Sequence, residues 1–277
     1  MARTSAVKQT VVYIKKNGRL FMNQRDWRFI IIAAVISLLV CAIVGEDMFT
    51  TYESTKSGFF AIISAAIWIG IFNSIQSICK EHATITSEYR SGLHMSAYVM
   101  AHVIFDFALC LVQSAILMGI CMIYVDFPKT GIIFGNSIPE YFITLFLIIW
   151  GSDIMGIMVS AVASTPNVAM TAMPFVLILQ LIMSGVLFSL KGWAEKIANI
   201  TFSKWGMSAM GSIGDLNSEE LPLSISLAFP NVIRLSTEPA YDAVPENLFM
   251  AWGIMLLISA VCILIAVLSL KIKNRGS

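Results

Sequence analysis

The chain has 277 residues, of which 57% are hydrophobic and only 13% are charged. A soluble domain carries about 25% charged residues, so this composition excludes one and indicates an integral membrane protein. The formal net charge of +1 provides no basic surface for nucleic acid, and we expect no nucleic-acid partner.

Apolar runs recur along the chain at lengths close to the roughly 20 residues that a helix needs to cross a bilayer. The sequence therefore predicts an all-α integral membrane protein. The six transmembrane helices are expected at residues 29–44, 58–79, 97–124, 137–163, 168–190 and 247–270. We divide the chain into an amino-terminal segment (1–28), a membrane domain (29–272) and a short tail (273–277).

The amino-terminal segment is basic and has no apolar core followed by a cleavage site, so we expect no cleavable signal peptide. Its apolar residues fall into two groups on either side of Asn17-Gly18. This pattern predicts two short amphipathic helices lying at the membrane interface.

The connector between the second and third predicted spans, residues 80–96, is the internal loop richest in charge of both signs. It holds Lys80, Glu81, Glu88 and Arg90. Because charged side chains are costly in hydrocarbon, the connector must lie at or beyond the membrane face. Such a segment can present charges to a soluble partner, although a simple solvated turn is the alternative.

Helix-start signals precede the fourth and fifth spans. Ser137, with Glu140 three residues later, matches a capping box, and Thr165 precedes Pro166 at the start of the fifth span. Pro174 inside the fifth span removes a backbone hydrogen bond and can bend that helix.

The predicted outer segment, residues 191–245, contains amphipathic stretches rather than a plain linker. We expect an extracellular or re-entrant segment with helices packed at or dipping into the outer leaflet, and a small extracellular cap is the alternative. The amino-terminal segment, the connector and the tail hold 12 of the 18 Lys and Arg residues. The positive-inside rule therefore predicts that both termini and the connector are cytoplasmic.

Two acidic residues, Asp106 and Asp153, fall inside predicted spans at similar depth, about 15 Å from the cytoplasmic side. Two carboxyl groups at one depth could share a proton, as in an intramembrane aspartyl protease or a proton-coupled carrier. The alternative is that each is hydrogen-bonded within the helix packing. No catalytic motif, metal-ligand spacing or phosphate-binding loop is present, so we expect no cofactor and no metal in this chain.

Several short motifs occur in an order that resembles the membrane domain of G-subfamily (white-type) ABC transporters. They are Arg25-Asp26, Glu81 with Glu88-Tyr89-Arg90-Ser91-Gly92, Ser96-Ala97-Tyr98 followed by Asp106, Gly156 with Ser160-Ala161, Ser184-Gly185-Val186-Leu187-Phe188, and Ser203-Lys204-Trp205-Gly206-Met207. The resemblance covers nearly the whole chain. It implies a permease subunit of an ATP-driven exporter that works by alternating access at a central cavity between two such subunits.

The resemblance also implies roles for individual residues. The central cavity would be lined by Phe72, Asn73, Gln76, Phe175, Gln180 and Leu181, and its outer gate would be Val186 and Leu187. The connector would be a coupling helix in which Glu81, Glu88, Tyr89 and Arg90 contact the ATPase. These assignments are expectations from the family pattern.

The ATPase domain fused to eukaryotic members of this subfamily is absent from these residues. The resemblance therefore implies a bacterial plasma-membrane system whose ATP and Mg²⁺ bind to a separate ATPase subunit. The second permease would be another copy or a paralogue. A related chain could instead extrude lipid-linked glycans, with the amphipathic amino-terminal segment as a lateral entry. The cargo is not specified by these motifs.

Overall fold

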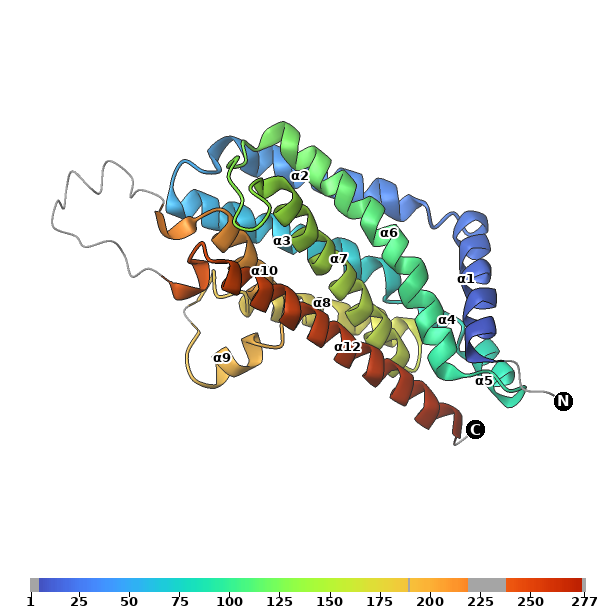
Figure 1. The fold of residues 1–277 in the computed structure, drawn as a ribbon. Coiled ribbons are helices and arrows are strands. Elements are labelled where there is room, and N and C mark those ends of the chain that lie inside the picture. Colours follow the sequence, from blue (N-terminus) through green and yellow to red (C-terminus); the bar gives the residue numbers. More distant parts are fainter. Residues whose placement is uncertain (1–4, 189, 219–237, 276–277) are drawn as a thin grey trace, which may run out of the picture.

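The computed structural model describes residues 5–188, 190–218 and 238–275, and within these residues every regular element is helical. The long helices lie side by side in one bundle, with α1, α5 and the C-terminus at the same end (Figure 1). We call this the connector end. Parts of the predicted outer segment and tail, residues 219–237 and 276–277, lie outside the described residues.

The helices of the first half are α1 (Ala6–Asn23), α2 (Arg28–Val44), α3 (Tyr52–Ser74), α4 (Ser77–Lys80), α5 (His82–Arg90) and α6 (Met95–Tyr124). Those of the second half are α7 (Ser137–Val162), α8 (Pro166–Ile182), α9 (Trp193–Ala198), α10 (Phe202–Ile213) and α12 (Pro245–Arg275). Short 3-10 turns are η1 (Gly45–Asp47), η2 (Leu216–Ser218) and η3 (Pro239–Tyr241).

Four helical stretches in the described residues are long and apolar enough to cross a membrane. They are Tyr52–Lys80, Met95–Tyr124, Ser137–Val162 and Pro245–Asn274. The pair α1 and α2 meets the same test together but is bent by 69°, and α8 has only 17 residues. The all-helical membrane protein is therefore confirmed with four or five candidate spans, while the count of six stays a prediction.

α1 is one continuous helix, and the predicted division at Asn17-Gly18 is wrong. A glycine within a helix costs about 1 kcal/mol relative to alanine, which is the signal that suggested a break. Here the helix is held by packing, because Tyr13 and Asn17 are buried and Phe21 contacts Phe105 of α6 edge-on, with ring centroids 5.7 Å apart. Tertiary contact therefore overrides the local preference.

α3 and α7 form the most extensive helix pair in the bundle and approach closely through small residues. A Cβ atom added at Gly70 would clash with the carbonyl of Ile149, and one added at Gly156 would clash with the Ser74 hydroxyl. Ser74 donates a hydrogen bond of 2.5 Å to the carbonyl of Asp153. This contact, with no side chain at either glycine, fixes α3 against α7, and α3 leads directly into the connector.

Two predicted spans have different ends in the structure. α3 begins at Tyr52 rather than at residue 58, because Thr51 and Ser54 form a capping box. α8 ends at Ile182 rather than at residue 190, and the chain then turns through Gly185, whose φ is 81°. Capping and turn residues, rather than hydropathy, set these ends.

The start of α7 also differs in detail from the prediction. Asn136, not Ser137, is the N-cap, and its side chain accepts a hydrogen bond from the Ile138 amide at 3.0 Å. Glu140 is fully buried and accepts hydrogen bonds from three consecutive amides, residues 132–134, at 2.6 to 3.0 Å. A buried carboxylate with three amide donors is well compensated, so Glu140 holds the α6–α7 loop.

α10 lies inside the bundle, where it packs against α12, α7, α3 and α8. All of its residues are buried except Lys204. The part of the predicted outer segment that forms α10 is therefore inserted among the other helices and covered by protein. Its small residues allow this, since a Cβ at Gly211 would overlap the ring of Tyr241.

Candidate functional site

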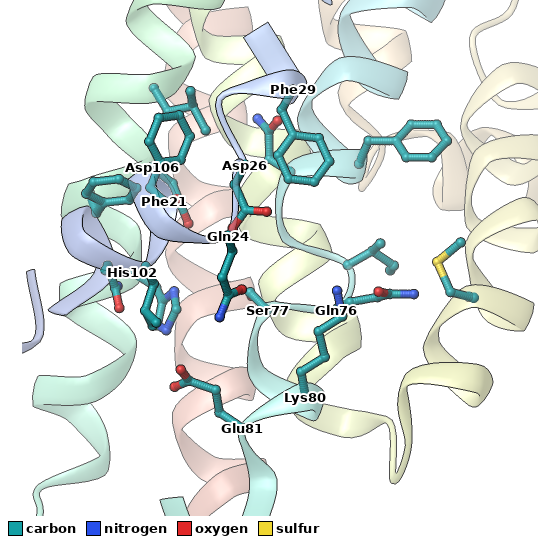
Figure 2. A pocket seen from close by; sticks show the side chains of 18 residues that line it. Phe21, Gln24, Asp26, Phe29, Gln76, Ser77, Lys80, Glu81, His102 and Asp106 are labelled. Atoms are coloured by element: carbon teal, nitrogen blue, oxygen red, sulfur yellow. The ribbon is translucent and has the colours of Figure 1, made fainter. Parts of the chain in front are cut away.

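A cavity of about 430 Å³ lies near the connector end, between α1, the α1–α2 turn, the start of α2, α3–α4, α6 and Met170 of α8 (Figure 2). Apolar walls come largely from four aromatic rings, Phe21, Phe29, Phe72 and Phe105. The polar side chains on its lining are Asn17, Gln24, Asp26, Asn73, Gln76, Ser77, Lys80, Glu81, His102 and Asp106. Its volume and mixed lining are typical of a small-molecule site.

All three cavity residues predicted on the second span, Phe72, Asn73 and Gln76, line this cavity. Asn73 is not free for a ligand, because it makes a reciprocal amide pair with Gln113 of α6. The Asn73 Nδ2 donates to Gln113 Oε1 at 2.7 Å, and Gln113 Nε2 donates back at 3.0 Å. Asn73 therefore ties α3 to α6, whereas the side chain of Gln76 makes no such bond.

The residues predicted on the fifth span do not line this cavity. Phe175 is 71% exposed on the outer face of α8. Gln180 is buried, and its Oε1 accepts a 3.2 Å hydrogen bond from the amide of Ser203, while the Ser203 hydroxyl donates to its carbonyl. Leu181 is half-buried beside it. Within one chain, the two predicted halves of the central cavity are thus separate, and their shared role stays a prediction.

The predicted gate lies in the loop that follows α8, at the end of the bundle opposite the connector. Val186 packs against the main core, and Leu187 is 52% exposed. Beside this loop, a second cavity of about 560 Å³ is lined by Ser184, Gly185 and residues of α9, α10, η3 and α12. The gate role itself stays a prediction.

The two acidic residues have different surroundings. Asp106 lines the cavity near the connector end. Asp153 is fully buried between α7 and α3, lines neither cavity, and neither of its carboxylate oxygens has a hydrogen-bond partner among the described residues. The two groups are close enough to repel each other when both are charged. They do not face a common pocket, which a shared proton site would need.

The connector is held against α1 through its glutamates. The Lys16 ammonium contacts Glu81 Oε2 at 3.0 Å, and the Tyr98 hydroxyl donates to the same oxygen at 3.0 Å. The Tyr13 hydroxyl donates to Glu88. Burial, together with the carboxylate of Glu88, raises the pKa of Tyr13, so this phenol stays a hydrogen-bond donor.

The Gln9 side chain of α1 also binds backbone groups between α5 and α6. The Gln9 side chain donates to the carbonyl of Gly92 at 3.2 Å and accepts from the amide of His94 at 2.8 Å. α1, α5 and the start of α6 therefore form one packed unit. Two of the four predicted ATPase-coupling residues, Glu81 and Glu88, point into this unit.

The outward face of α5 carries different residues. Ala83, Thr84, Ser87 and Arg90 are exposed at helical spacing, and Tyr89 is half-buried beside them. Of the predicted coupling residues, Arg90 is thus the one on the exposed face. A protein that docked on this helix would meet this stripe first.

Three polar residues of the cavity region were not singled out as site residues from the sequence. Asn17 lies on α1, and His102 and Gln113 lie on α6. A signal was present, because His102, Asp106 and Gln113 follow one another at intervals of four and seven residues, which puts them on one face of a helix. Asn17 could not be placed without knowing that α1 packs against this face.

Burial also affects the acidic residue in the α1–α2 turn. Desolvation raises the pKa of Asp26, and the nearby Lys80 ammonium partly opposes this shift. Asp26 and Lys80 face one another across the same cavity in Figure 2.

Comparison with known proteins agrees with this architecture. The ABC-2 type transporter family matches residues 10–213, which span α1 to α10. An ABC transporter ATP-binding/permease protein of Mycobacterium tuberculosis is 27% identical over 155 residues, covering 54% of this chain and 18% of that protein. The chain thus matches less than a fifth of that relative's length. The helices, the connector and the extent of this match together place the chain in the ABC-2 type transporter membrane family, to which it belongs.

Proposed function

We propose that this chain is the permease subunit of an ATP-driven exporter whose ATPase is a separate polypeptide. The ATPase docks on the connector, and its closure on ATP and Mg²⁺ moves α5. Family membership supports a transmembrane component of an ABC transporter. The proposal adds the export direction, the separate ATPase, the alternating access and a bacterial plasma membrane in which both termini face the cytoplasm.

The observation that carries this proposal is the way the connector is mounted. α5 presents an exposed stripe at the end of the bundle, while its other face is fastened to α1 and α6 through Glu81 and Glu88. α4 then joins α5 to α3, which packs tightly on α7. A push on the exposed stripe would therefore be transmitted to the long helices instead of being absorbed by a loose loop.

The exposed apolar face of α8 fits a pairing of two permeases. Phe175, Ile178 and Leu179 are 71%, 53% and 43% exposed. In the proposed transporter, a second copy or a paralogue faces this surface, and the predicted central cavity lies between the two chains. The proposed cargo path then combines α8 residues of both subunits with the α3 residues Phe72 and Gln76, and ends at Val186 and Leu187.

The test is co-purification of the tagged chain from its native source in mild detergent, followed by identification of bound proteins. We expect an ATPase with a phosphate-binding loop. The exposed-face variants Ser87→Glu and Arg90→Glu should lose the ATPase and its stimulation while keeping the melting temperature of the parent. Thr130→Glu, on the exposed α6–α7 loop at the end of the bundle opposite α5, is the matched control and should keep the ATPase.

The proposal would be contradicted if the chain transported its cargo with no ATPase bound. It would also be contradicted if Ser87→Glu and Arg90→Glu kept full coupling to the ATPase. A proton-coupled carrier would then be favoured, for which the observation is that both Asp106 and Asp153 are buried without a hydrogen-bond partner among the described residues. That alternative requires Asp153→Asn to abolish transport, whereas the ATP-driven exporter tolerates it.

A further inference from the structure

The cavity near the connector end contains an unusual number of unpaired polar groups. Seven polar side chains on its lining make no hydrogen bond to the described residues. They are Asn17, Gln24, Asp26, Gln76, Lys80, His102 and Asp106. Neighbouring polar residues are paired, because Asn73 bonds to Gln113 and Glu81 bonds to Lys16 and Tyr98. Unpaired polar groups thus gather on this cavity wall, although buried ones also occur elsewhere, as at Asp153.

Three of these groups lie deep in the wall. Asn17, His102 and Asp106 are only 6%, 7% and 8% exposed, and neither amide atom of Asn17 nor His102 Nε2 has a partner. A buried polar group without a partner costs about 1 to 3 kcal/mol, so three together on one cavity wall need an explanation. A ligand that donates hydrogen bonds to them supplies one.

The charge of the lining selects the kind of ligand. Of its carboxylates, Glu81 is already compensated by Lys16, which leaves Asp26 and Asp106. Lys80, at the exposed edge, is the lysine on the lining and acts on Asp26. Asp106, in the deep wall, has no cation beside it among the described residues. The deep part of the cavity thus offers acceptors and negative charge.

The remaining wall is aromatic. Phe21, Phe29, Phe72 and Phe105 come from four different helices or turns and surround the polar groups. Aromatic faces attract organic cations and also bury apolar bodies, so they suit a molecule that carries both. Figure 2 shows Phe21, Phe29 and His102 around the space into which Gln24 and Asp26 project.

We propose that this intrasubunit cavity binds a primary ammonium attached to a flat apolar body. The ammonium donates to Asp106, Asn17 Oδ1 and His102 Nε2, and the apolar body lies among the four phenylalanine rings. The site is built from a single chain, so it does not depend on the pairing of two permeases or on an ATPase. It goes beyond the exporter proposal.

The experiment uses the purified full chain in lipid nanodiscs, without any ATPase, and the fluorescent probe dansylcadaverine, which has a primary ammonium and an aromatic body. Its N-acetyl derivative has the same body without the charge. We expect saturable fluorescence enhancement by dansylcadaverine and at least about tenfold weaker binding of the acetylated probe. Asp106→Asn should weaken dansylcadaverine binding about tenfold, as one lost charge contact predicts.

Asp153→Asn is the matched control, because it makes the same chemical change in a buried acid that does not line the cavity. It removes no group that contacts the probe, and because the two acids repel each other when both are charged, it favours the ionised form of Asp106. Dansylcadaverine binding should therefore be weakened by no more than about twofold. Should Asp106→Asn fail to fold, Asp26→Asn and Asn17→Leu test the same cavity from the turn and from α1. Each should weaken the charged probe more than the acetylated one.

Equal binding of the two probes would overturn the proposal, since the cavity would then take apolar bodies regardless of charge. Enhancement that does not saturate, or that is lost equally in Asp106→Asn and Asp153→Asn, would also overturn it and leave water as the occupant. Because the assay contains no ATPase, its result does not depend on the exporter proposal. The probe can bind even if no ATPase docks on the connector, and an ATPase can dock even if the probe does not bind.

Discussion

Replacing Glu81 gives the sharpest test of how the connector is held. Its carboxylate accepts hydrogen bonds from Lys16 of α1 and Tyr98 of α6, both at 3.0 Å. Tyr98 is fully buried, so in Glu81→Ala its hydroxyl loses this acceptor while it stays buried in the parent packing. In Glu81→Gln, the amide oxygen can still accept from Tyr98, and only the ion pair is lost.

The loss of unfolding free energy can be estimated for the lost Tyr98 hydrogen bond and for the lost ion pair. An orphaned buried hydroxyl costs about 1 to 3 kcal/mol. The Lys16–Glu81 pair is 30% and 21% exposed, which limits its contribution to about 1 kcal/mol or less. Glu81→Ala should therefore cost about 1 to 4 kcal/mol and Glu81→Gln less than about 1 kcal/mol. At roughly 2 to 4 °C per kcal/mol, the melting temperature should fall by about 2 to 16 °C for Glu81→Ala and by less than about 4 °C for Glu81→Gln.

The assay is thermal unfolding of the full chain in detergent, with Thr84→Ala on the exposed face of α5 as the control, which should change the melting temperature little. The double variant Glu81→Ala/Tyr98→Phe should be more stable than Glu81→Ala plus Tyr98→Phe would predict, because no hydroxyl is left without an acceptor. Equal, small effects of Glu81→Ala and Glu81→Gln would refute the reasoning that Glu81 joins α1, α5 and α6.

Three further substitutions probe the frame around the cavity by the same thermal assay. Gly156→Ala should cost about 1 to 3 kcal/mol because the new Cβ would clash with the Ser74 hydroxyl. Gly119→Ala is the control, which should be neutral or slightly stabilising because there is open space around Gly119. Equal effects of the two substitutions would contradict the close α3–α7 contact. Lys273→Met should lower the melting temperature by a few degrees, since the Lys273 ammonium donates to three carbonyls at the end of α7 at 2.6 to 2.9 Å; an unchanged value would count against this cap. Asn73→Leu should destabilise the protein more than Asn73→Leu/Gln113→Leu, because the single change removes the partner of the buried Gln113 amide. A larger loss of stability in the double variant would show that the two amides are not coupled.

Hydropathy and charge predicted the class of protein and the general position of most long helices. They work because hydrocarbon excludes charged side chains and unpaired backbone, which leaves few alternatives. The same reasoning predicts that the connector lies at or beyond the membrane face, and the structure forms α5 within residues 80–96. The end of α8 was missed because residues 183–188 are as apolar as the helix before them, and the turn at Gly185 depends on backbone conformation.

The depth at which α10 is inserted could not be predicted for a related reason. The spacing of Trp205 and Met210 predicts an apolar helix face packed at or dipping into the outer leaflet, and both side chains are buried against protein. An amphipathic pattern states that a helix has an apolar face, but it does not state whether lipid or protein covers that face. Only the packing partners, α12, α7, α3 and α8, decide this.

The contribution of α1 to the cavity could not be predicted, because the sequence predicts a break at Asn17-Gly18. Once α1 is continuous, Tyr13, Lys16, Asn17, Leu20 and Phe21 follow the i, i+3, i+4, i+7, i+8 spacing of a single helix face. The first two contact the glutamates of the connector, and the last three line the cavity. Two short pieces divided at Asn17-Gly18 would have separated these groups. Because one rigid helix carries both sets of contacts, a molecule that fills the cavity and a protein that moves the connector act on the same element.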